Sequence, residues 1–184
     1  MILLRHGQSE FNLHFTQTRR DPGIEDPSLT DLGREQARAA GRALRDAGIR
    51  RIITSPYTRT LQTTAHVLEA IDAPVVVNPL VRERYAFACD IGTARTELAM
   101  RWPDHGFDHL NEVWWPPAEE TADSIIGRAR RFRSEMAAIE GWEDTLVITH
   151  WGFILSLTGQ SVMNGQWLRC DPRAEGPATV TWKA

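Results

Sequence analysis

The chain has 184 residues, of which 42% are hydrophobic and 24% charged. These proportions are typical of a globular protein and exclude a disordered or fibrous chain. The formal net charge of −3 argues against a general nucleic-acid-binding protein. No apolar run approaches the roughly 18 residues that a membrane span needs. From the charge and the absence of such a run, we expect neither nucleic acid nor a membrane as partner. The length favours a single domain over residues 1–184 with a large buried core.

The amino-terminal segment does not read as a secretory signal. Met-Ile-Leu-Leu is followed directly by Arg5 and His6, whereas a signal peptide carries its charges before the apolar stretch and a small-residue cleavage site after it. We therefore expect a cytoplasmic protein. Cys89 and Cys170 offer neither a disulfide framework nor metal-ligand spacing, so we expect two reduced thiols.

Hydrophobic periodicity and turn signals predict that strands and helices alternate along the first half of the chain. The expected elements are a buried strand over 2–5, a loop over 12–28, a helix over 30–47 capped by Thr30, a strand over 49–54, a helix after Pro56 that ends near Ile71, and a strand over 75–77.

The second half opens with residues 84–118, which have no periodicity and are rich in aromatic side chains. So long a loop in a compact domain is typical of a lid or binding loop. The elements expected after it are a helix between Thr121 and Gly141, a strand over 145–149, a helix over 153–163 and a final strand over 180–182. Four arginines lie mainly off the apolar stripe of the first of these helices, so we expect a solvated face there: Arg128, Arg130, Arg131 and Arg133.

This alternation predicts an α/β protein, a three-layer α/β/α sandwich with a mostly parallel central sheet and a lid-like insertion at about 84–118. Ligands of such folds bind beyond the carboxyl ends of the strands. The residues that follow each predicted strand are therefore the candidates for function.

Charged and titratable side chains follow four of the predicted strands. Arg5 and His6 end the first, Arg59 follows the second, Glu83 the third, and His150 the fourth. Two histidines and a glutamate could bind a metal, but the two arginines would repel a dication. Arginine and histidine together are typical of a pocket for a dianion such as phosphate, whose oxygens arginine grips bidentately. We therefore expect a phosphate site and no metal.

Five blocks of sequence resemble the histidine phosphatase superfamily, the phosphoglycerate-mutase-like proteins. The first block, residues 4–12, has Arg-His-Gly, a polar residue, Ser9, two free positions and Asn12. The remaining blocks follow in the family's order: Leu29-Thr30 with Gly33, Gln36 and Ala37; Ser55-Pro56 with Arg59-Thr60, Gln62-Thr63 and Ala65; residues 80–83; and residues 147–152. The chain departs from the family at Val81, where leucine is frequent, and at Trp151, where glycine is frequent.

The resemblance implies a metal-independent phosphatase without a cofactor, which hydrolyses phosphomonoesters of small metabolites through a phosphohistidine intermediate on His6. Nearby arginines disfavour the protonated imidazole and so lower its pKa, which keeps the nucleophile neutral. Glu83 is the expected general acid, a role that needs a carboxyl pKa raised toward neutrality. The side chains expected to bind the phosphate oxygens are Arg5, Asn12, Arg59 and His150.

Some assignments stay open at this point. Glu97, Glu119 or Glu120 could replace Glu83 as the acid if the 84–118 segment folds over the site. The other histidines are expected to be non-catalytic: His14, His66, His105 and His109.

The segments that surround the predicted pocket offer candidates for substrate recognition. Arg19 and Arg20 could meet a second anionic group or be exposed loop arginines. Of Trp114 and Trp115, we expect one to pack in the core and the other to wall the cleft or stack on a ring.

Three other functions compete with the phosphatase acting on small metabolites. The first is a protein phosphatase that acts on phosphohistidine or phosphotyrosine. The second is a phosphoglycerate-type mutase, which the shortness of the chain disfavours. The third is a non-catalytic protein that binds phosphate ligands, which has no use for the pair His6 and Glu83. The sequence leaves the oligomeric state open, although Trp167 and Trp182 could lie at an interface.

Overall fold

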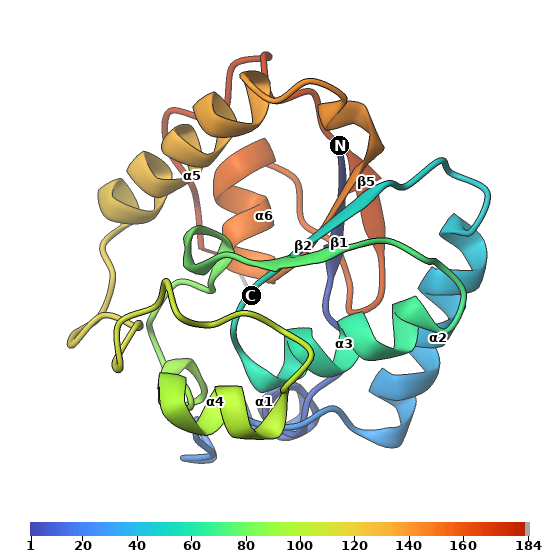
Figure 1. Cartoon of the computed structure of the whole chain (residues 1–184). Helices are drawn as coiled ribbons and strands as arrows, with labels where there is room; N and C mark the ends of the chain where they lie inside the picture. The colour runs from blue at the N-terminus through green and yellow to red at the C-terminus, as the bar shows by residue number, and fades with distance from the viewer. Residues whose placement is uncertain (183–184) are drawn as a thin grey trace.

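The computed structural model describes residues 1–182, and a five-stranded sheet with the strand order β3-β2-β4-β1-β5 lies at its centre (Figure 1). The strands are β1 (Ile2–Arg5), β2 (Arg51–Thr54), β3 (Val75–Val77), β4 (Thr145–Thr149) and β5 (Trp167–Arg169). β1 to β4 run parallel, and β5 pairs antiparallel with β1 at the sheet edge. The predicted α/β fold with a mostly parallel sheet is confirmed.

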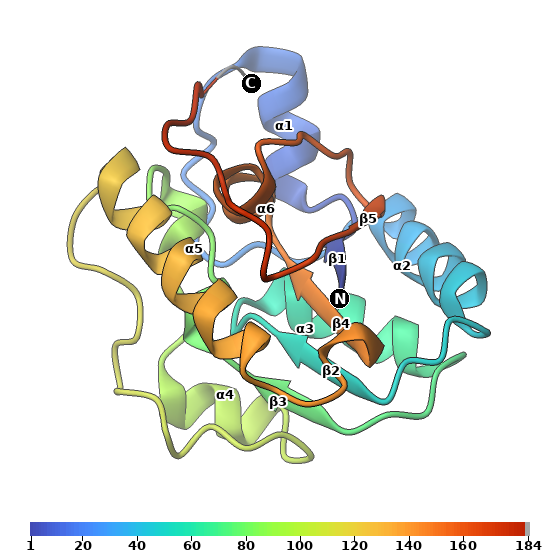
Figure 2. The ribbon, with the colours of Figure 1, turned by 90° about the horizontal axis from the view of Figure 1, so that it is seen from above.

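Helices cover both faces of this sheet. They are α1 (Glu10–Thr18), α2 (Asp31–Leu44), α3 (Thr58–Leu68), α4 (Arg95–Arg101), α5 (Ala122–Ala137) and α6 (Trp151–Thr158), with the one-turn 3-10 helices η1 (Pro79–Val81), η2 (Ala88–Asp90) and η3 (Trp142–Asp144). α2 and α3 lie on one face, and α5 and α6 lie on the other (Figure 2). This arrangement gives the predicted three layers.

Alternation along β1 shows how the sheet divides the core. Leu3 packs with side chains of α5 and α6, whereas Ile2 and Leu4 pack with side chains of α2 and α3. This is the two-residue period of a strand buried on both sides. Thr30 and Thr121 cap α2 and α5 as predicted, because each side chain accepts a hydrogen bond from a backbone N–H of the first turn.

The structure corrects three predicted elements. Residues 12–28 are not all loop, because α1 occupies the first part of that range. Ser9 caps α1 in a reciprocal pair with Asn12, and only Phe11 of this helix is buried, so its apolar stripe is short. The expected strand over 180–182 is absent from the described sheet, and β5 takes the edge position beside β1. α6 spans residues 151–158 instead of 153–163.

Two of the arginines expected on a solvated face are buried. Arg128 pairs with Glu120 (Nη2 to Oε2, 2.6 Å) and donates to the carbonyl oxygens of Leu80 and Arg82. Arg133 donates to the carbonyl oxygen of Leu157 in the last turn of α6 and to those of Asp171 and Ala174. Both guanidinium groups therefore satisfy carbonyl groups that helices and strands leave unpaired. Arg130 and Arg131 are exposed as expected.

The insertion over 84–118 contains η2 and α4, and its buried side chains pack with Tyr57 and Leu61 at the start of α3. Trp114 and Phe107 join Tyr57 in a third buried cluster, and Trp114 Nε1 donates to the Thr93 carbonyl oxygen (2.9 Å). Trp115 packs against the same cluster, so neither tryptophan walls the cleft, contrary to the prediction. Of the insertion, only residues between Arg84 and Asp90 line the cavity that contains His6.

The remaining global predictions have simple outcomes. Cys89 and Cys170 are both free thiols, as predicted. Among residues 1–182, no helix combines the length and the apolar character that crossing a bilayer requires.

Candidate active site

The pairing of β1 with β4 places the two predicted histidines side by side. The backbone N–H of His6 donates to the carbonyl oxygen of Thr149 (2.9 Å), and the rings of His6 and His150 have centroids 5.2 Å apart. Both side chains are almost completely buried at the carboxyl ends of their strands. Gly7 makes the turn after β1 possible, because a Cβ at this position would lie 2.1 Å from the carbonyl oxygen of Gly33.

The tautomer of His6 follows from one hydrogen bond. Its Nδ1 lies 2.7 Å from the carbonyl oxygen of Gly7, which can only accept. Nδ1 therefore carries the proton and Nε2 carries the lone pair. Burial, with the positive charges of Arg59 and Arg5, holds the pKa of His6 well below its usual range. The imidazole is thus neutral and nucleophilic at neutral pH.

Arg59 is buried, Arg5 is partly buried, and both are charged. Arg5 Nη1 donates to the carbonyl oxygen of Val162 (2.9 Å), while its buried Nε has no partner among residues 1–182. Burial lowers the pKa of Arg5 to about 10, so its guanidinium remains protonated at neutral pH. Arg59 lies on the first turn of α3 and donates to the Cys89 carbonyl oxygen (2.7 Å) and to Asp90 Oδ1 (3.1 Å). These bonds leave N–H donors on both guanidinium groups for an anion.

His150 lies behind His6 and does not line the cavity in the described part of the chain. Its Nε2 lies 2.8 Å from the Ser55 hydroxyl, while its buried Nδ1 has no partner among the described residues. Burial and the charge of Arg59 hold its pKa well below the usual range, so it is neutral.

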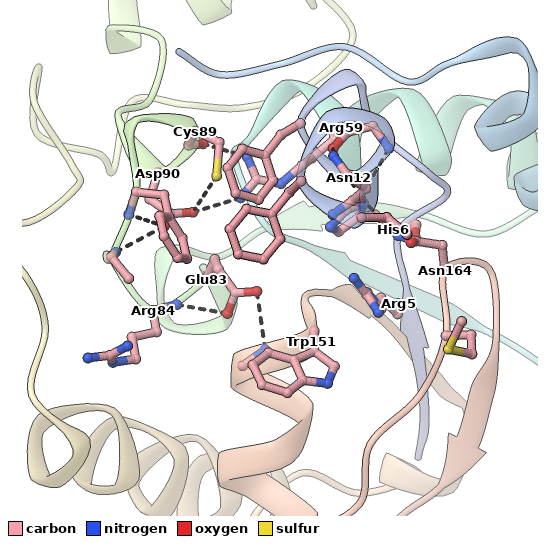
Figure 3. A pocket seen from close by; sticks show the side chains of 18 of the residues that line it. Arg5, His6, Asn12, Arg59, Glu83, Arg84, Cys89, Asp90, Trp151 and Asn164 are labelled. Carbon is pink, nitrogen blue, oxygen red and sulfur yellow. Dashed lines mark hydrogen bonds and ion pairs between the residues drawn. The ribbon is translucent and has the colours of Figure 1, made fainter. Parts of the chain in front are cut away.

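Glu83 follows η1, and its carboxyl group points into the cavity (Figure 3). It accepts hydrogen bonds from the backbone N–H groups of Arg84 (2.8 Å) and Gly152 (3.1 Å). Burial, followed by the negative charge of Asp90, raises its pKa. This carboxyl group is therefore prepared to hold a proton.

The three other candidate acids are held in ion pairs away from the cavity. Glu97 pairs with Arg101, Glu119 with Arg84, and Glu120 with Arg128. None of the three lines the cavity, whereas Glu83 does.

These groups surround one cavity with a volume of about 340 Å³. Asn12 lines it, and its Oδ1 accepts hydrogen bonds from the Ser9 N–H and from Asn164 Nδ2, both at 3.1 Å. The five predicted residues that line the cavity are Arg5, His6, Asn12, Arg59 and Glu83. In residues 1–182, no group of three or more His, Cys, Asp or Glu side chains is arranged to hold a metal ion.

Sequence reasoning missed several residues of this cavity. Asp90 is 1% exposed and holds Arg59, and its Oδ2 also accepts the N–H groups of Ala86 and Phe87 (3.0 and 3.2 Å). Trp182 also lines the cavity. The i, i+4 spacing of Phe11 and Phe15 was a usable signal for one aromatic wall, whereas no local pattern marks Asp90.

Other assignments at the rim have mixed outcomes. Arg19 lines the cavity and is exposed, whereas Arg20 does not line it. The four histidines expected to be non-catalytic are also absent from its wall: His14, His66, His105 and His109.

With the geometry in place, the sequence profile of the histidine phosphatase superfamily (branch 1) matches residues 1–172. The chain belongs to this superfamily. A 2,3-bisphosphoglycerate-dependent phosphoglycerate mutase of Methylobacterium sp. (strain 4-46) is 33% identical over 163 residues, 82% of this chain and 74% of the relative. A bifunctional protein of Mycobacterium tuberculosis is 32% identical over 159 residues, 82% of this chain but only 40% of that protein.

Solved structures of histidine phosphatases share the fold. The mycobacterial glucosyl-3-phosphoglycerate phosphatase in complex with VO3 superposes with a TM-score of 0.64 at 22% identity, over 91% of this chain and 88% of that one. The family and the enzyme class predicted from the sequence, a histidine-phosphatase-type enzyme, are confirmed.

Proposed function

We propose that this histidine phosphatase hydrolyses phosphomonoesters of small molecules through a phosphohistidine intermediate on His6, without a metal ion. One observation carries the proposal. A neutral imidazole with a free Nε2 lone pair shares a cavity with two charged guanidinium groups and with a carboxyl group whose pKa is raised. These are the nucleophile, the phosphate ligands and the general acid of a phosphoryl transfer.

In the first step, Nε2 of His6 attacks phosphorus, and the P–O bond to the alcohol breaks as the P–N bond forms. Protonated Glu83 gives its proton to the departing oxygen and becomes a carboxylate. Arg5 and Arg59 balance the charge on the non-bridging oxygens, which is the main requirement of a loose phosphoryl transition state. Asn12 provides a further polar contact at this end of the cavity, whereas His150, predicted to bind the phosphate, lies behind His6 and supports its ring.

In the second step, the Glu83 carboxylate takes a proton from water as the water oxygen attacks phosphorus. The P–N bond breaks, inorganic phosphate leaves, and both His6 and Glu83 regain their starting protonation states. The same carboxyl group thus serves as acid and then as base, which favours a pKa near the working pH.

The proposal is tested by hydrolysis of an aryl phosphate in EDTA. His6→Ala is compared with the wild type and with His109→Ala, which removes an exposed histidine away from the cavity. We expect equal turnover by the wild type and His109→Ala, and none above background by His6→Ala. Turnover that survives in His6→Ala overturns the nucleophile assignment. Tight phosphate binding without any wild-type turnover would identify a non-catalytic binding protein.

A phosphoglycerate mutase is the second candidate, because a relative with 33% identity carries that name. A mutase passes the phosphoryl group of phosphohistidine to a phosphoglycerate instead of water. Incubation with 3-phosphoglycerate and 2,3-bisphosphoglycerate, followed by phosphorus NMR, separates the two activities. We expect inorganic phosphate to accumulate without 2-phosphoglycerate, and net isomerisation would favour the mutase.

A further inference from the structure

The outer part of the cavity is lined by two aromatic clusters from different parts of the fold. Phe11 and Phe15 of α1 meet Phe87 of the insertion, with ring centroids 5.1 to 5.4 Å apart. Trp151 and Trp182 form the second cluster, with centroids 6.0 Å apart. All five side chains line the cavity that contains His6. The space beside the phosphate end is therefore bounded by rings.

The cations near these rings are largely engaged. Arg84 donates to Glu119 Oε1 (2.6 Å) and to the Glu120 carbonyl oxygen (2.8 Å), and its guanidinium lies 4.7 Å from the centre of the Trp182 ring. Arg19 is exposed to solvent, and its guanidinium lies 5.9 Å from the centre of the Phe15 ring. An exposed cation attracts an anion only weakly because water and salt screen it. Among residues 1–182, a second carboxylate or phosphate on the substrate would thus find no buried, unengaged cation at this end.

Several polar groups that line the cavity are also paired with each other. Trp151 Nε1 donates to the Ser161 hydroxyl (2.8 Å), the Ser9 hydroxyl donates to Asn12 Oδ1 (3.0 Å), and Asn164 Nδ2 donates to that same oxygen. A sugar or other polyhydroxyl group entering here would give up its water for few hydrogen bonds. Losing hydrogen bonds to water without replacing them is unfavourable, whereas an apolar group gains free energy when it leaves water for this space.

We propose that the substrate is a small phosphomonoester whose alcohol part carries a flat aromatic ring, bound against these two clusters. The inference rests on the proposed phosphatase function and adds its substrate class. Aromatic rings pair best edge-to-face or offset at centroid separations of about 4.5 to 7 Å. Phe87 is 39% exposed, so its ring is available for such a contact. This class differs from the phosphoglycerates named for the relatives, which carry a carboxylate and no ring.

The test compares three esters of primary alcohols: 2-phenylethyl phosphate, ethyl phosphate and 3-phosphoglycerate. Their leaving groups have similar chemistry, so differences in kcat/KM report binding of the rest of the molecule. We expect 2-phenylethyl phosphate to exceed ethyl phosphate by about 30-fold, as burial of a phenyl group implies. We expect 3-phosphoglycerate to be no better than ethyl phosphate. Equal values for the first two, or a preference for 3-phosphoglycerate, overturns the inference.

Variants locate the preference in the aromatic wall. Phe15→Ala and Phe87→Ala should each reduce the phenylethyl-to-ethyl ratio of kcat/KM at least threefold. Leu32→Ala is the matched control, because Leu32 is an exposed apolar side chain of α2 outside the cavity. Turnover of ethyl phosphate shows that both phenylalanine variants are folded. If both then keep the wild-type ratio, the proposed position of the ring is wrong.

Two further arms separate related outcomes. Free phosphotyrosine is compared with a short phosphotyrosine peptide. An equal or lower value for the peptide supports a small-molecule substrate, and a clear preference for the peptide overturns it. If ethyl, phenylethyl and aryl phosphates are all inert, the proposed function itself fails. If they are all hydrolysed without preference for a ring, only the substrate class fails.

Discussion

Replacement of Gly152 by alanine tests the position of the general acid. Gly152 is the second residue of α6, and its N–H donates to Glu83 Oε2 (3.1 Å). A Cβ at residue 152 would lie 2.4 Å from Glu83 Oε1 and 3.3 Å from Cδ, whereas ordinary contact begins at 3.4 Å. The carboxyl group would therefore have to move by about 1 Å.

A displacement of this size in a reacting group costs about 100-fold in rate, which corresponds to about 2.7 kcal/mol of transition-state stabilisation. The rate is lost in the step in which Glu83 protonates the leaving oxygen. The three atoms nearest to the added methyl group belong to Glu83 and Trp182, not to His6, Arg5 or Arg59, so inhibition by inorganic phosphate should be nearly unchanged.

The assay measures kcat/KM for an alkyl phosphate and for an aryl phosphate with a weakly basic leaving group. The aryl oxide departs with little help from an acid, so its loss should be below about tenfold, against about 100-fold for the alkyl ester. Gly127→Ala is the control, since Gly127 is an exposed residue of α5 with nothing within 4 Å of its added Cβ. It should keep wild-type kinetics and gain about 0.5 to 1 kcal/mol of stability. Equal losses for the two esters, or no loss, would refute the assignment of Glu83 as acid.

Three further predictions follow from buried charges. Because the pKa of Glu83 is raised and its protonated form is the active one, kcat/KM for an alkyl phosphate should fall as the pH rises through that pKa, and Glu83→Gln should abolish this alkaline limb. Asp90→Asn removes the ion pair to Arg59 and the negative charge that helps raise the pKa of Glu83, so KM should rise and the alkaline limb should move to lower pH. An unchanged pH profile would leave Asp90 with only a structural role. Arg128→Met leaves the buried Glu120 carboxylate with only the longer ion pair to Arg82 (3.2 Å) and should cost about 3–5 kcal/mol in urea unfolding, whereas exposed Arg130→Met should cost almost nothing.

Local signals were enough to predict four of the five strands and part of the site. The buried parallel strands are continuous apolar runs, and Arg5, His6 and Glu83 lie close after such runs in the sequence. Their convergence follows from the parallel topology alone. The caps at Thr30 and Thr121 were visible for the same reason, because a cap depends on residues within one turn.

The missed features depend on contacts distant in sequence. Asp90 reaches Arg59 across 31 residues because the start of the insertion folds back over α3. Arg128 donates to a carbonyl oxygen 46 residues away, and no helical periodicity reveals such a contact. β5 is short and mostly exposed at the sheet edge, so it lacks the apolar run that marked the other strands. Trp182 joins the cavity only through tertiary packing on Trp151.

The central claim is covalent catalysis by His6, and trapping the intermediate tests it most directly. The enzyme is mixed with an aryl phosphate in EDTA, quenched in alkaline denaturant within the first turnover, and digested for mass spectrometry. We predict one phosphoryl group on the peptide that contains His6, lost on brief acid treatment and absent from His6→Ala. A phosphoryl group on another residue, or full wild-type turnover without any phosphorylated enzyme, would contradict the account.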